Sequence, residues 1–251
     1  MILRQAQHSR DAELAAAIAA DAGKLLLDVQ RRMSGKEAGA EGDRAANALI
    51  LDRLAAARPD DAVLSEERKC DGSRVAASRV WIVDPLDGTR EFSEGRDDWA
   101  VHVALAIDGV ATVGAVALPA LDVVLASTPA PIVPAAATPP RMLVSRSRPA
   151  AEALAVAEYL GASLVPMGSA GAKAMAVVRG EAEIYLHSGG QYEWDNCAPV
   201  AVAQAARLHC SRIDGSALIY NCADPYLPDL LICRPELADT ILTFVARMSN
   251  A

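Results

Sequence analysis

The sequence has no surplus of basic residues and few aromatic ones. Its 24 lysine and arginine residues face 32 aspartate and glutamate residues, which gives a formal net charge of −8. A polynucleotide-binding surface needs clustered positive charge, and stacking of several bases needs aromatic platforms, yet only 4% of the residues are aromatic. We therefore expect no polynucleotide partner, and an anionic substrate would need cations recruited to the site.

The sequence also lacks a cysteine framework and a long uninterrupted apolar run. Its cysteines show no C-x-x-C spacing and are odd in number: Cys70, Cys197, Cys210, Cys222 and Cys233. This argues against disulfides or a structural zinc site and favours a reducing cytoplasm. Charged residues within 1–30 break any signal-peptide core, and Gly114, Pro119 and Asp122 interrupt the longest apolar tract. We expect a soluble, cytoplasmic protein with no membrane partner.

The order of the predicted elements changes at a proline-rich segment, residues 129–140. Before it, helices over 11–32 and 43–58 and a strand over 80–84 lead into an antiparallel meander, which predicts an α+β half. After it, strands and helices alternate in the α/β manner. With 52% hydrophobic residues, the chain has ample material for a core. We predict an α/β protein with an N-terminal domain over 1–137 and a C-terminal domain over 138–251.

The stretch VWIVDPLDGTREFS, residues 80–93, brings two carboxylates to one place. Asp84 follows an apolar run, and we expect the strand to end there because Pro85 cannot donate a ladder hydrogen bond. Asp87 precedes Gly88, which permits close approach of a ligand, and the next residues predict a first helical turn that attracts an anion. Two carboxylates beside an anion site favour a divalent metal such as Mg²⁺. Taken alone, each aspartate is equally typical of turns and helix caps.

Three motifs together resemble the signatures of the inositol monophosphatase superfamily of Mg²⁺-dependent, lithium-sensitive phosphatases: SEE at 65–67, DPLDGTREF at 84–92 and EWDNCAP at 193–199. Haloacid dehalogenase phosphatases are excluded, because one residue separates their aspartates and two separate them here. Segments 168–195 and 220–233 are most similar to bacterial 3′(2′),5′-bisphosphate nucleotidases of sulfate assimilation. The resemblance covers almost the whole chain and implies the layered αβαβα sugar-phosphatase fold.

The resemblance implies two Mg²⁺ ions, often with a third, weaker one. Glu66, Asp84 and the carbonyl of Leu86 would bind one ion, while Asp84, Asp87 and Asp195 would bind the second. Asp84 would therefore bridge the two metals. The residues alone also allow Asp195 to be a cap of the helix that follows it.

The resemblance also implies that Asp43 and Thr89 orient and deprotonate the attacking water, with Glu66 as a further catalytic residue. A helix N-cap after Gly42 is the simpler interpretation of Asp43, and both roles are compatible. We interpret His102 as a strand residue and not as a ligand, because Mg²⁺ prefers oxygen donors.

Substrate contacts are expected from eight positions, two of them also metal or water residues: Asp87, Gly88, Thr89, Ser145, Gly168, Ser169, Lys173 and Tyr192. Lys173 lies one helical turn after Ser169 and would pair with a second phosphate, or else be an ordinary exposed helix lysine. Tyr192 would stack on an adenine, or serve as a lid or packing residue. Ser188 stands where inositol monophosphatases carry a glutamate for a sugar hydroxyl, so inositol specificity is not expected.

These features predict hydrolysis of the 3′-phosphate of adenosine 3′,5′-bisphosphate, and of its sulfated form, to AMP and phosphate. Water would attack in line, with no phosphoenzyme. Inositol monophosphatase or fructose-1,6-bisphosphatase activity is the alternative within the superfamily. A non-catalytic metal- or nucleotide-binding regulator and a structural interaction protein are alternatives of other classes. The expected partner is a small phosphorylated nucleotide, and a homodimer is left open.

Overall fold

The computed structural model of the chain describes residues 2–68 and 72–248, so Cys70 and Asp71 of the predicted loop lie outside the described residues. The helices are α1 (Ile2–Arg32), α2 (Gly35–Ala57), α3 (Thr89–Ser93), α4 (Ala151–Leu160), α5 (Ala170–Val178), α6 (Glu193–Ala205) and α7 (Pro235–Met248). The strands of the first sheet are β1 (Ala62–Ser65), β2 (Arg79–Asp87), β3 (Ala100–Ile107), β4 (Val110–Leu118) and β5 (Val123–Ala126). Those of the second are β6 (Arg141–Ser145), β7 (Ser163–Met167), β8 (Ile184–Tyr192), β9 (His209–Ser211) and β10 (Tyr226–Cys233).

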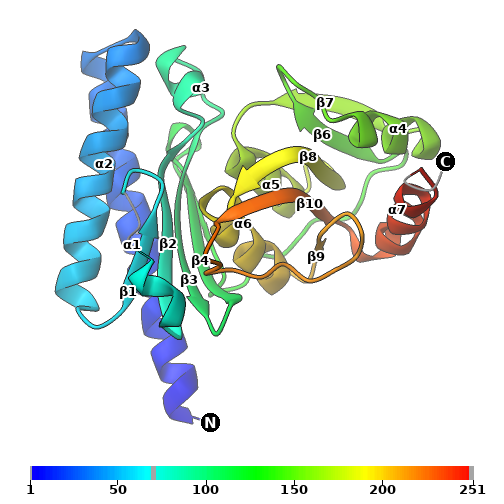
Figure 1. Ribbon diagram of the computed structural model, residues 1–251. Helices are drawn as coiled ribbons and strands as arrows, with labels where there is room; N and C mark the ends of the chain where they lie inside the picture. The colour runs from blue at the N-terminus through cyan, green and yellow to red at the C-terminus, as the bar shows by residue number, and fades with distance from the viewer. Residues whose placement is uncertain (1, 69–71, 249–251) are drawn as a thin grey trace.

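The elements stack in five layers, helix, sheet, helix, sheet, helix (Figure 1). α1 and α2 cover one face of the first sheet, in which the strand order is β1-β2-β3-β4-β5. α5 and α6 fill the space between this sheet and the second, whose order is β7-β6-β8-β10-β9. α4 and α7 cover the far face of the second sheet. The predicted α/β class and the layered αβαβα fold are confirmed.

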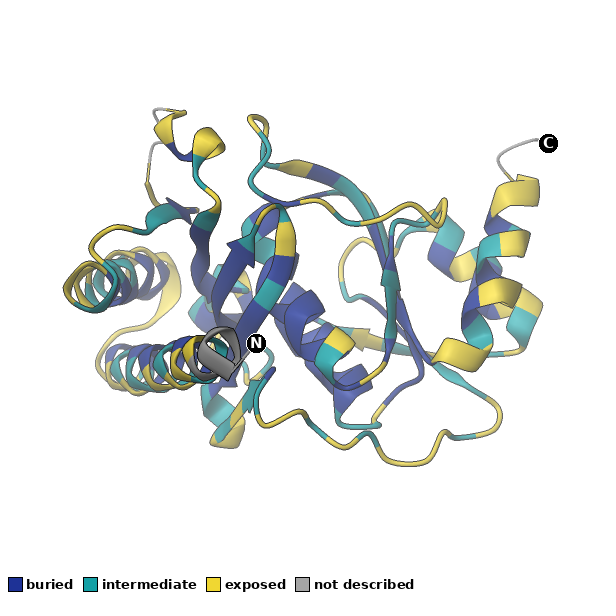
Figure 2. Ribbon diagram, turned by 90° about the horizontal axis from the view of Figure 1, so that it is seen from below, coloured by how far each residue is buried: buried dark blue, intermediate teal, exposed yellow. Residues whose placement is uncertain are grey.

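The largest core lies between the two sheets and combines both halves of the chain. It joins Ala104 and Val116 of the first sheet to Met175 of α5, Val200 of α6 and Leu230 of the second sheet. Figure 2 shows the central helices as almost wholly buried, and every residue of α5 is buried. Such burial suits a helix that carries small apolar residues on all sides. The domain boundary between residues 137 and 138 stays a prediction, since one core extends across it.

The predicted meander is present. β3, β4 and β5 pair antiparallel in sequence, and Asp108 and Gly109 turn the chain between β3 and β4 with φ angles of 50° and 79°. Of the helices in the described part of the chain, none is both long and apolar enough to cross a bilayer. Within the same residues, the cysteines at 197, 210, 222 and 233 are free thiols.

The strand that carries Asp84 does not end at Pro85, contrary to our prediction. β2 continues to Asp87. A bulge between Asp84 and Asp87 interrupts its pairing with β3, so Pro85 lies where no hydrogen bond to β3 is needed. On the other side, β1 pairs with β2 only as far as Val83. The missing N–H of Pro85 therefore leaves no ladder bond unmade.

Three helices begin earlier than predicted, and in two of them this changes the surroundings of an acidic residue. α1 begins at Ile2 and not at residue 11. α2 begins at Gly35, about two turns before Asp43, so the N-cap role of Asp43 is wrong. The start of α2 contains several glycines, which have a low helix propensity, so the sequence did not predict a helix there. α6 begins at Glu193 and not after Asp195, so Asp195 lies in its first turn.

Glycines in α2 explain how this helix approaches the DPLDGT turn. A Cβ atom on Gly39 would lie 2.9 Å from Thr89 Cγ2 and 2.6 Å from Ser93 Oγ. A Cβ on Gly42 would lie 3.2 Å from Leu86 Cδ2. All three distances are tighter than ordinary contacts, so a side chain at either position would push the turn and α3 away from α2. This packing brings Asp43 to the turn.

Candidate active site

Three carboxylates from two halves of the chain converge at the end of β2. Asp84, Asp87 and Asp195 each offer one oxygen, and these atoms lie within 4.8 Å of one another. Asp84 is 1% exposed and Asp87 is 7% exposed. Like charges this close in a buried place require a cation or a retained proton. The all-oxygen donor set fits a hard divalent cation such as Mg²⁺.

The charge repulsion within this cluster is visible in the pKa values. Burial, with the charges of Glu66 and Asp87 next in size, raises the pKa of Asp84 well above its usual range. Burial and the charge of Asp87 raise the pKa of Asp195 to about 7, although the Tyr192 N–H, which donates to Asp195 Oδ2 at 2.6 Å, opposes this shift. A cation bound among these carboxylates would offset the repulsion that raises the pKa values of Asp84 and Asp195.

Asp87 differs from its neighbours because it also caps α5. Its Oδ2 atom accepts hydrogen bonds from the Ser169 hydroxyl and, at 2.6 Å, from the Gly171 N–H, while Oδ1 accepts from the Ala170 N–H at 3.1 Å. Burial raises the pKa of Asp87, but His102 and these hydrogen bonds outweigh burial and lower the pKa to about 2. Asp87 therefore stays ionised, and its hydrogen bonds join the end of β2 to the start of α5.

Asp43, Thr89 and the Leu86 carbonyl form one corner of the site. The Thr89 hydroxyl donates to the Leu86 carbonyl at 3.1 Å, and the Leu86 N–H donates to Asp84 Oδ1 at 3.0 Å. Asp43 is 9% exposed, and its Oδ1 atom has no hydrogen-bond partner among the described residues. Burial, then the charges of Glu67 and Glu66, raise the pKa of Asp43 to about 7, although contact with Thr89 lowers it. A buried carboxylate oxygen without a partner is suited to bind a water proton.

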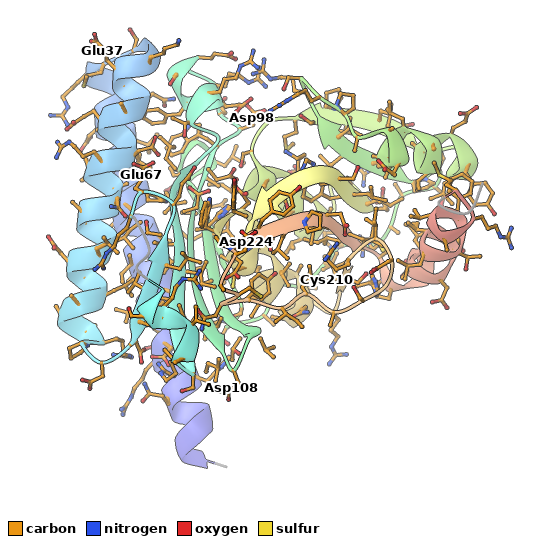
Figure 3. The ribbon with its side chains drawn as sticks, in the orientation of Figure 1. Glu37, Glu67, Asp98, Asp108, Cys210 and Asp224 are labelled. Carbon is orange, nitrogen blue, oxygen red and sulfur yellow. The ribbon has the colours of Figure 1, made fainter. Side chains whose placement is uncertain are left out.

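Glu66 lies at the open rim of the cluster, directly after β1. The residue as a whole is exposed, while its carboxylate contacts Asp84. Loss of solvent around that carboxylate raises the pKa of Glu66, as do Asp87 and Glu67, against the opposing effect of the contact with Asp84. Glu67, labelled in Figure 3, lies beside it at the end of β1, next to α2. The prediction that Glu66 joins the aspartates is consistent with this position and stays a prediction.

The loop that precedes α5 lies against Asp87 and is held from several sides. Ser169 has a left-handed φ of 49°, and the Gly168 N–H donates to Asp98 Oδ2 at 2.6 Å. Asp98 is labelled in Figure 3, between α3 and the second sheet. Gly88, with a φ of 90°, lies against Ser169, because a Cβ atom on Gly88 would be 3.1 Å from Ser169 Cβ. A non-glycine residue with positive φ marks a constrained place, as expected where a ligand binds.

Lys173 is not the exposed helix lysine of the simpler interpretation. The residue is 5% exposed, and burial lowers its pKa. Its ammonium donates to the Gly168 carbonyl at 3.1 Å and to the Ser169 carbonyl. Lys173 thus lies behind the loop and supports it, and direct contact with a second phosphate stays a prediction.

The two remaining predicted contacts lie on the second half of the chain. The Ser145 hydroxyl accepts the Arg148 N–H at 3.2 Å and so closes a turn after β6. Tyr192 is 44% exposed and stacks on Trp194, with ring centroids 4.7 Å apart and planes 10° from parallel. Tyr226 approaches Tyr192 edge-on at 5.9 Å. Tyr192 thus offers a partly exposed aromatic ring three residues before Asp195 in the sequence.

One residue close to the cluster was not recognised from the sequence. His102 lies at 0% exposure with Nε2 at 3.3 Å from Asp87 Oδ2 and Nδ1 at 3.0 Å from the Trp194 carbonyl. Burial lowers its pKa, but contact with Asp87 outweighs burial and raises it. Strand alternation places residue 102 on the face toward the central helices. The sequence holds no signal for its contacts, because they come from α6 and the β2 turn.

The model of the inositol monophosphatase family matches residues 8–131 and 134–241. The chain belongs to the inositol monophosphatase family. The prediction of this family from SEE, DPLDGT and EWD is therefore confirmed, as is the prediction of a phosphatase, a hydrolase.

Within this family, the chain is similar to bacterial enzymes with nucleotide names. It is 52% identical over 241 residues, 90% of each chain, to the 3′-phosphoadenosine 5′-phosphate phosphatase of Mycobacterium bovis. It is 32% identical over 197 residues, 74% of this chain and 80% of the other, to the 3′(2′),5′-bisphosphate nucleotidase CysQ of Escherichia coli. The crystal structure of CysQ from Bacteroides thetaiotaomicron superposes with a TM-score of 0.77 at 25% identity, covering 90% of this chain and 97% of the other.

Proposed function

We propose that this protein is a Mg²⁺-dependent 3′(2′),5′-bisphosphate nucleotidase that converts adenosine 3′,5′-bisphosphate to AMP and phosphate. The observation that carries the chemistry is the convergence of Asp84, Asp87 and Asp195 within 4.8 Å. The nucleotide substrate is supported by the 52% identity, over 90% of each chain, to a 3′-phosphoadenosine 5′-phosphate phosphatase. The sulfated nucleotide is a second expected substrate.

Mg²⁺ would be held by the three aspartates together with Glu66 and the Leu86 carbonyl. When bound, it supplies positive charge to the phosphate and to the departing ribose oxygen. The acidic composition of the chain is consistent with this arrangement, because the site then needs few basic side chains. We expect two such ions, with a third, weaker one at Asp43.

The residues of the chain itself position the water and receive its proton. Asp43, whose pKa is raised to about 7, is suited to accept a proton near neutral pH. The Thr89 hydroxyl, which donates to the Leu86 carbonyl at 3.1 Å, lies on the same corner and would fix the water beside Asp43. In-line attack then releases phosphate without a phosphoenzyme.

The nucleotide would extend from the acidic cluster across the second half of the chain. Gly88, Gly168 and Ser169 would contact the ribose and its phosphate, because their loops lie against Asp87. Tyr192 would stack on the adenine with its exposed face. Ser145 would contact the second phosphate. Lys173 would act on it through the Gly168–Ser169 loop that it supports.

The experiment that tests this function is phosphate release with and without Mg²⁺ from a panel of substrates. The panel is adenosine 3′,5′-bisphosphate, its sulfated form, inositol 1-phosphate and fructose 1,6-bisphosphate. We expect Mg²⁺-dependent release with the nucleotides preferred. An order-of-magnitude preference for inositol 1-phosphate or fructose 1,6-bisphosphate would assign a sugar phosphatase instead. No release from any of them, with Mg²⁺ still bound, would assign a regulator.

Several wider expectations accompany the proposal. An enzyme of this specificity would act in sulfate assimilation, in the cytoplasm, and would be inhibited by lithium. A homodimer stays an open alternative for the oligomeric state. Each is a property of the protein in solution or in the cell and requires its own measurement.

A further inference from the structure

His102 occupies a central place beside the acidic cluster. In the antiparallel pairing of β2 and β3, its Cα partner is Asp84, and on β4 its partner is Val116. The imidazole therefore starts from the strand next to the buried aspartate. It is 0% exposed and so is held by protein on all sides.

Three elements that build the site meet this ring. Its Nδ1 atom lies 3.0 Å from the Trp194 carbonyl in the first turn of α6, one residue before Asp195. Its Nε2 atom lies 3.3 Å from Asp87 Oδ2 in the β2 bulge. At the start of α5, a Cβ atom on Gly171 would lie 2.0 Å from His102 Nε2, so glycine is required there.

The chemistry of these neighbours fixes how the ring is placed. A carbonyl oxygen only accepts hydrogen bonds, so Nδ1 carries a hydrogen and donates it to Trp194. This bond sets the ring plane, and the plane aims Nε2 at Asp87. The Nε2 atom makes no well-aligned hydrogen bond to any described residue, so the side of the ring that faces Asp87 is set by the Nδ1 bond and by packing.

We propose that His102 is a positioning residue that holds Asp87 and Asp195 at the separation needed to share a metal ion. The proposal rests on the metal-dependent function proposed above. His102 acts by linking the start of α6, through the Trp194 carbonyl 3.0 Å from Nδ1, to Asp87 in the β2 bulge, 3.3 Å from Nε2. Groups that orient metal ligands from behind commonly change metal affinity when they are removed.

The test uses variants that keep one contact each. In H102N the amide nitrogen takes the place of Nδ1 and can donate to the Trp194 carbonyl. In H102Q the longer side chain places its amide nitrogen near Nε2, toward Asp87. H102A removes both contacts. The matched control is H209N, because His209 is a part-buried histidine of β9, at the edge of the second sheet, with Nε2 at 2.8 Å from Ser211 Oγ.

Calorimetric titration of the full chain with Mn²⁺, without substrate, is the main measurement, and kcat and KM are measured alongside. We expect H102A to weaken Mn²⁺ binding by about tenfold or more and to lower kcat more than it raises KM. H102N and H102Q each recover part of the affinity, and H209N binds Mn²⁺ as the wild type does. If H102A does not fold, the Mn²⁺ affinities of H102N and H102Q, compared with that of the wild type, test the proposal.

Two results would overturn the proposal. One is Mn²⁺ binding of wild-type strength in H102A, or in both H102N and H102Q. The other is a lowered melting temperature in every His102 variant with unchanged Mn²⁺ affinity, which assigns a purely structural histidine. Failure of the proposed function is distinguishable, because the wild-type protein itself would then neither bind Mn²⁺ nor release phosphate.

Discussion

The carboxylate of Asp87 accepts the backbone N–H of Gly171 at 2.6 Å, and this hydrogen bond joins the β2 bulge to the start of α5. One residue is thus both a candidate metal ligand and a fastening between the two halves of the chain. Within residues 2–68 and 72–248, its neighbour Asp84 accepts no such bond from the second half, and it sits among like charges. The site therefore combines one carboxylate with a lowered pKa, Asp87, with two whose pKa values are raised by burial and like charges, Asp84 and Asp195.

Replacement of Asp84 by asparagine should raise the stability of the metal-free protein and lower its activity. D84N removes a buried group whose charged form is repelled by Glu66, Asp87 and Asp195, so the metal-free protein should gain about 1 kcal/mol or more in unfolding free energy at pH 8. The same change should lower kcat by roughly a thousandfold or more. Urea unfolding in EDTA and phosphate release in Mg²⁺ measure the two effects. Turnover near the wild-type level, with Mg²⁺ still bound, would refute the assignment of Asp84 as the bridging ligand.

The metal-free protein should lose stability as the pH rises. Asp43 and Asp195 have pKa values of about 7 in the folded protein, against an ordinary value of 3.8. Between these values the folded state binds more protons than the unfolded state, so the free energy of unfolding falls as the pH increases from about 4 to about 7. Mg²⁺ competes with those protons and should stabilise the protein more at pH 8 than at pH 5. Melting curves in EDTA and in Mg²⁺ at both pH values test this, and an equal Mg²⁺ effect at both would contradict it.

Local and distant parts of the site differ in how far the sequence reveals them. Asp84, Asp87 and Thr89 lie within one short turn, so their proximity follows from chain connectivity. The approach of Asp195 depends on the packing of α6 against the first sheet, and only the resemblance to a family predicts it. The role of His102 depends on the β2–β3 register, which pairs it with Asp84, and on its contact with Gly171 of α5, a helix far along the chain.

Boundaries were predicted less well than the existence of elements, for local reasons. Pro85 and Gly35 both argue for a break, yet a bulge and an early helix start accommodate them. The burial of Lys173 could not be foreseen either, because its partners are backbone carbonyls of the preceding loop.

Asp43 should be needed for turnover and much less for metal binding. D43N keeps the shape of the side chain but cannot accept a proton, so we expect kcat to fall by about 10²- to 10⁴-fold with little change in Mn²⁺ affinity. D52N is the matched control, since Asp52 is an exposed aspartate of the same helix. Steady-state kinetics and calorimetry measure the two quantities. A loss of Mn²⁺ binding equal to that of D84N would make Asp43 a principal ligand.

The close approach of α2 to α3 should matter for activity as well as stability. A Cβ atom in G39A would lie 2.6 Å from Ser93 Oγ and 2.9 Å from Thr89 Cγ2, so α3 and Thr89 must shift relative to α2, which carries Asp43. G23A is a matched control, because its Cβ would crowd Pro119 at 2.7 Å, outside the predicted site. Both variants should lose about 1–3 kcal/mol of unfolding free energy, but only G39A should also lose kcat. Equal kcat in both variants would show that the position of Thr89 is unimportant.

Tyr192 should distinguish nucleotides from small phosphate esters. The residue is 44% exposed and its ring lies flat against Trp194, so we expect the exposed part of the ring to contact a base. Stacking of a base on an aromatic ring contributes about 1–3 kcal/mol, so Y192A should raise KM for adenosine 3′,5′-bisphosphate by about tenfold and leave hydrolysis of p-nitrophenyl phosphate unchanged. Y159A is the control, because Tyr159 is 54% exposed and stacks on Phe244 of α7, at the far side of the second sheet. An equal loss on both substrates would assign the Tyr192 side chain to packing of the α6 start, where its ring stacks on Trp194.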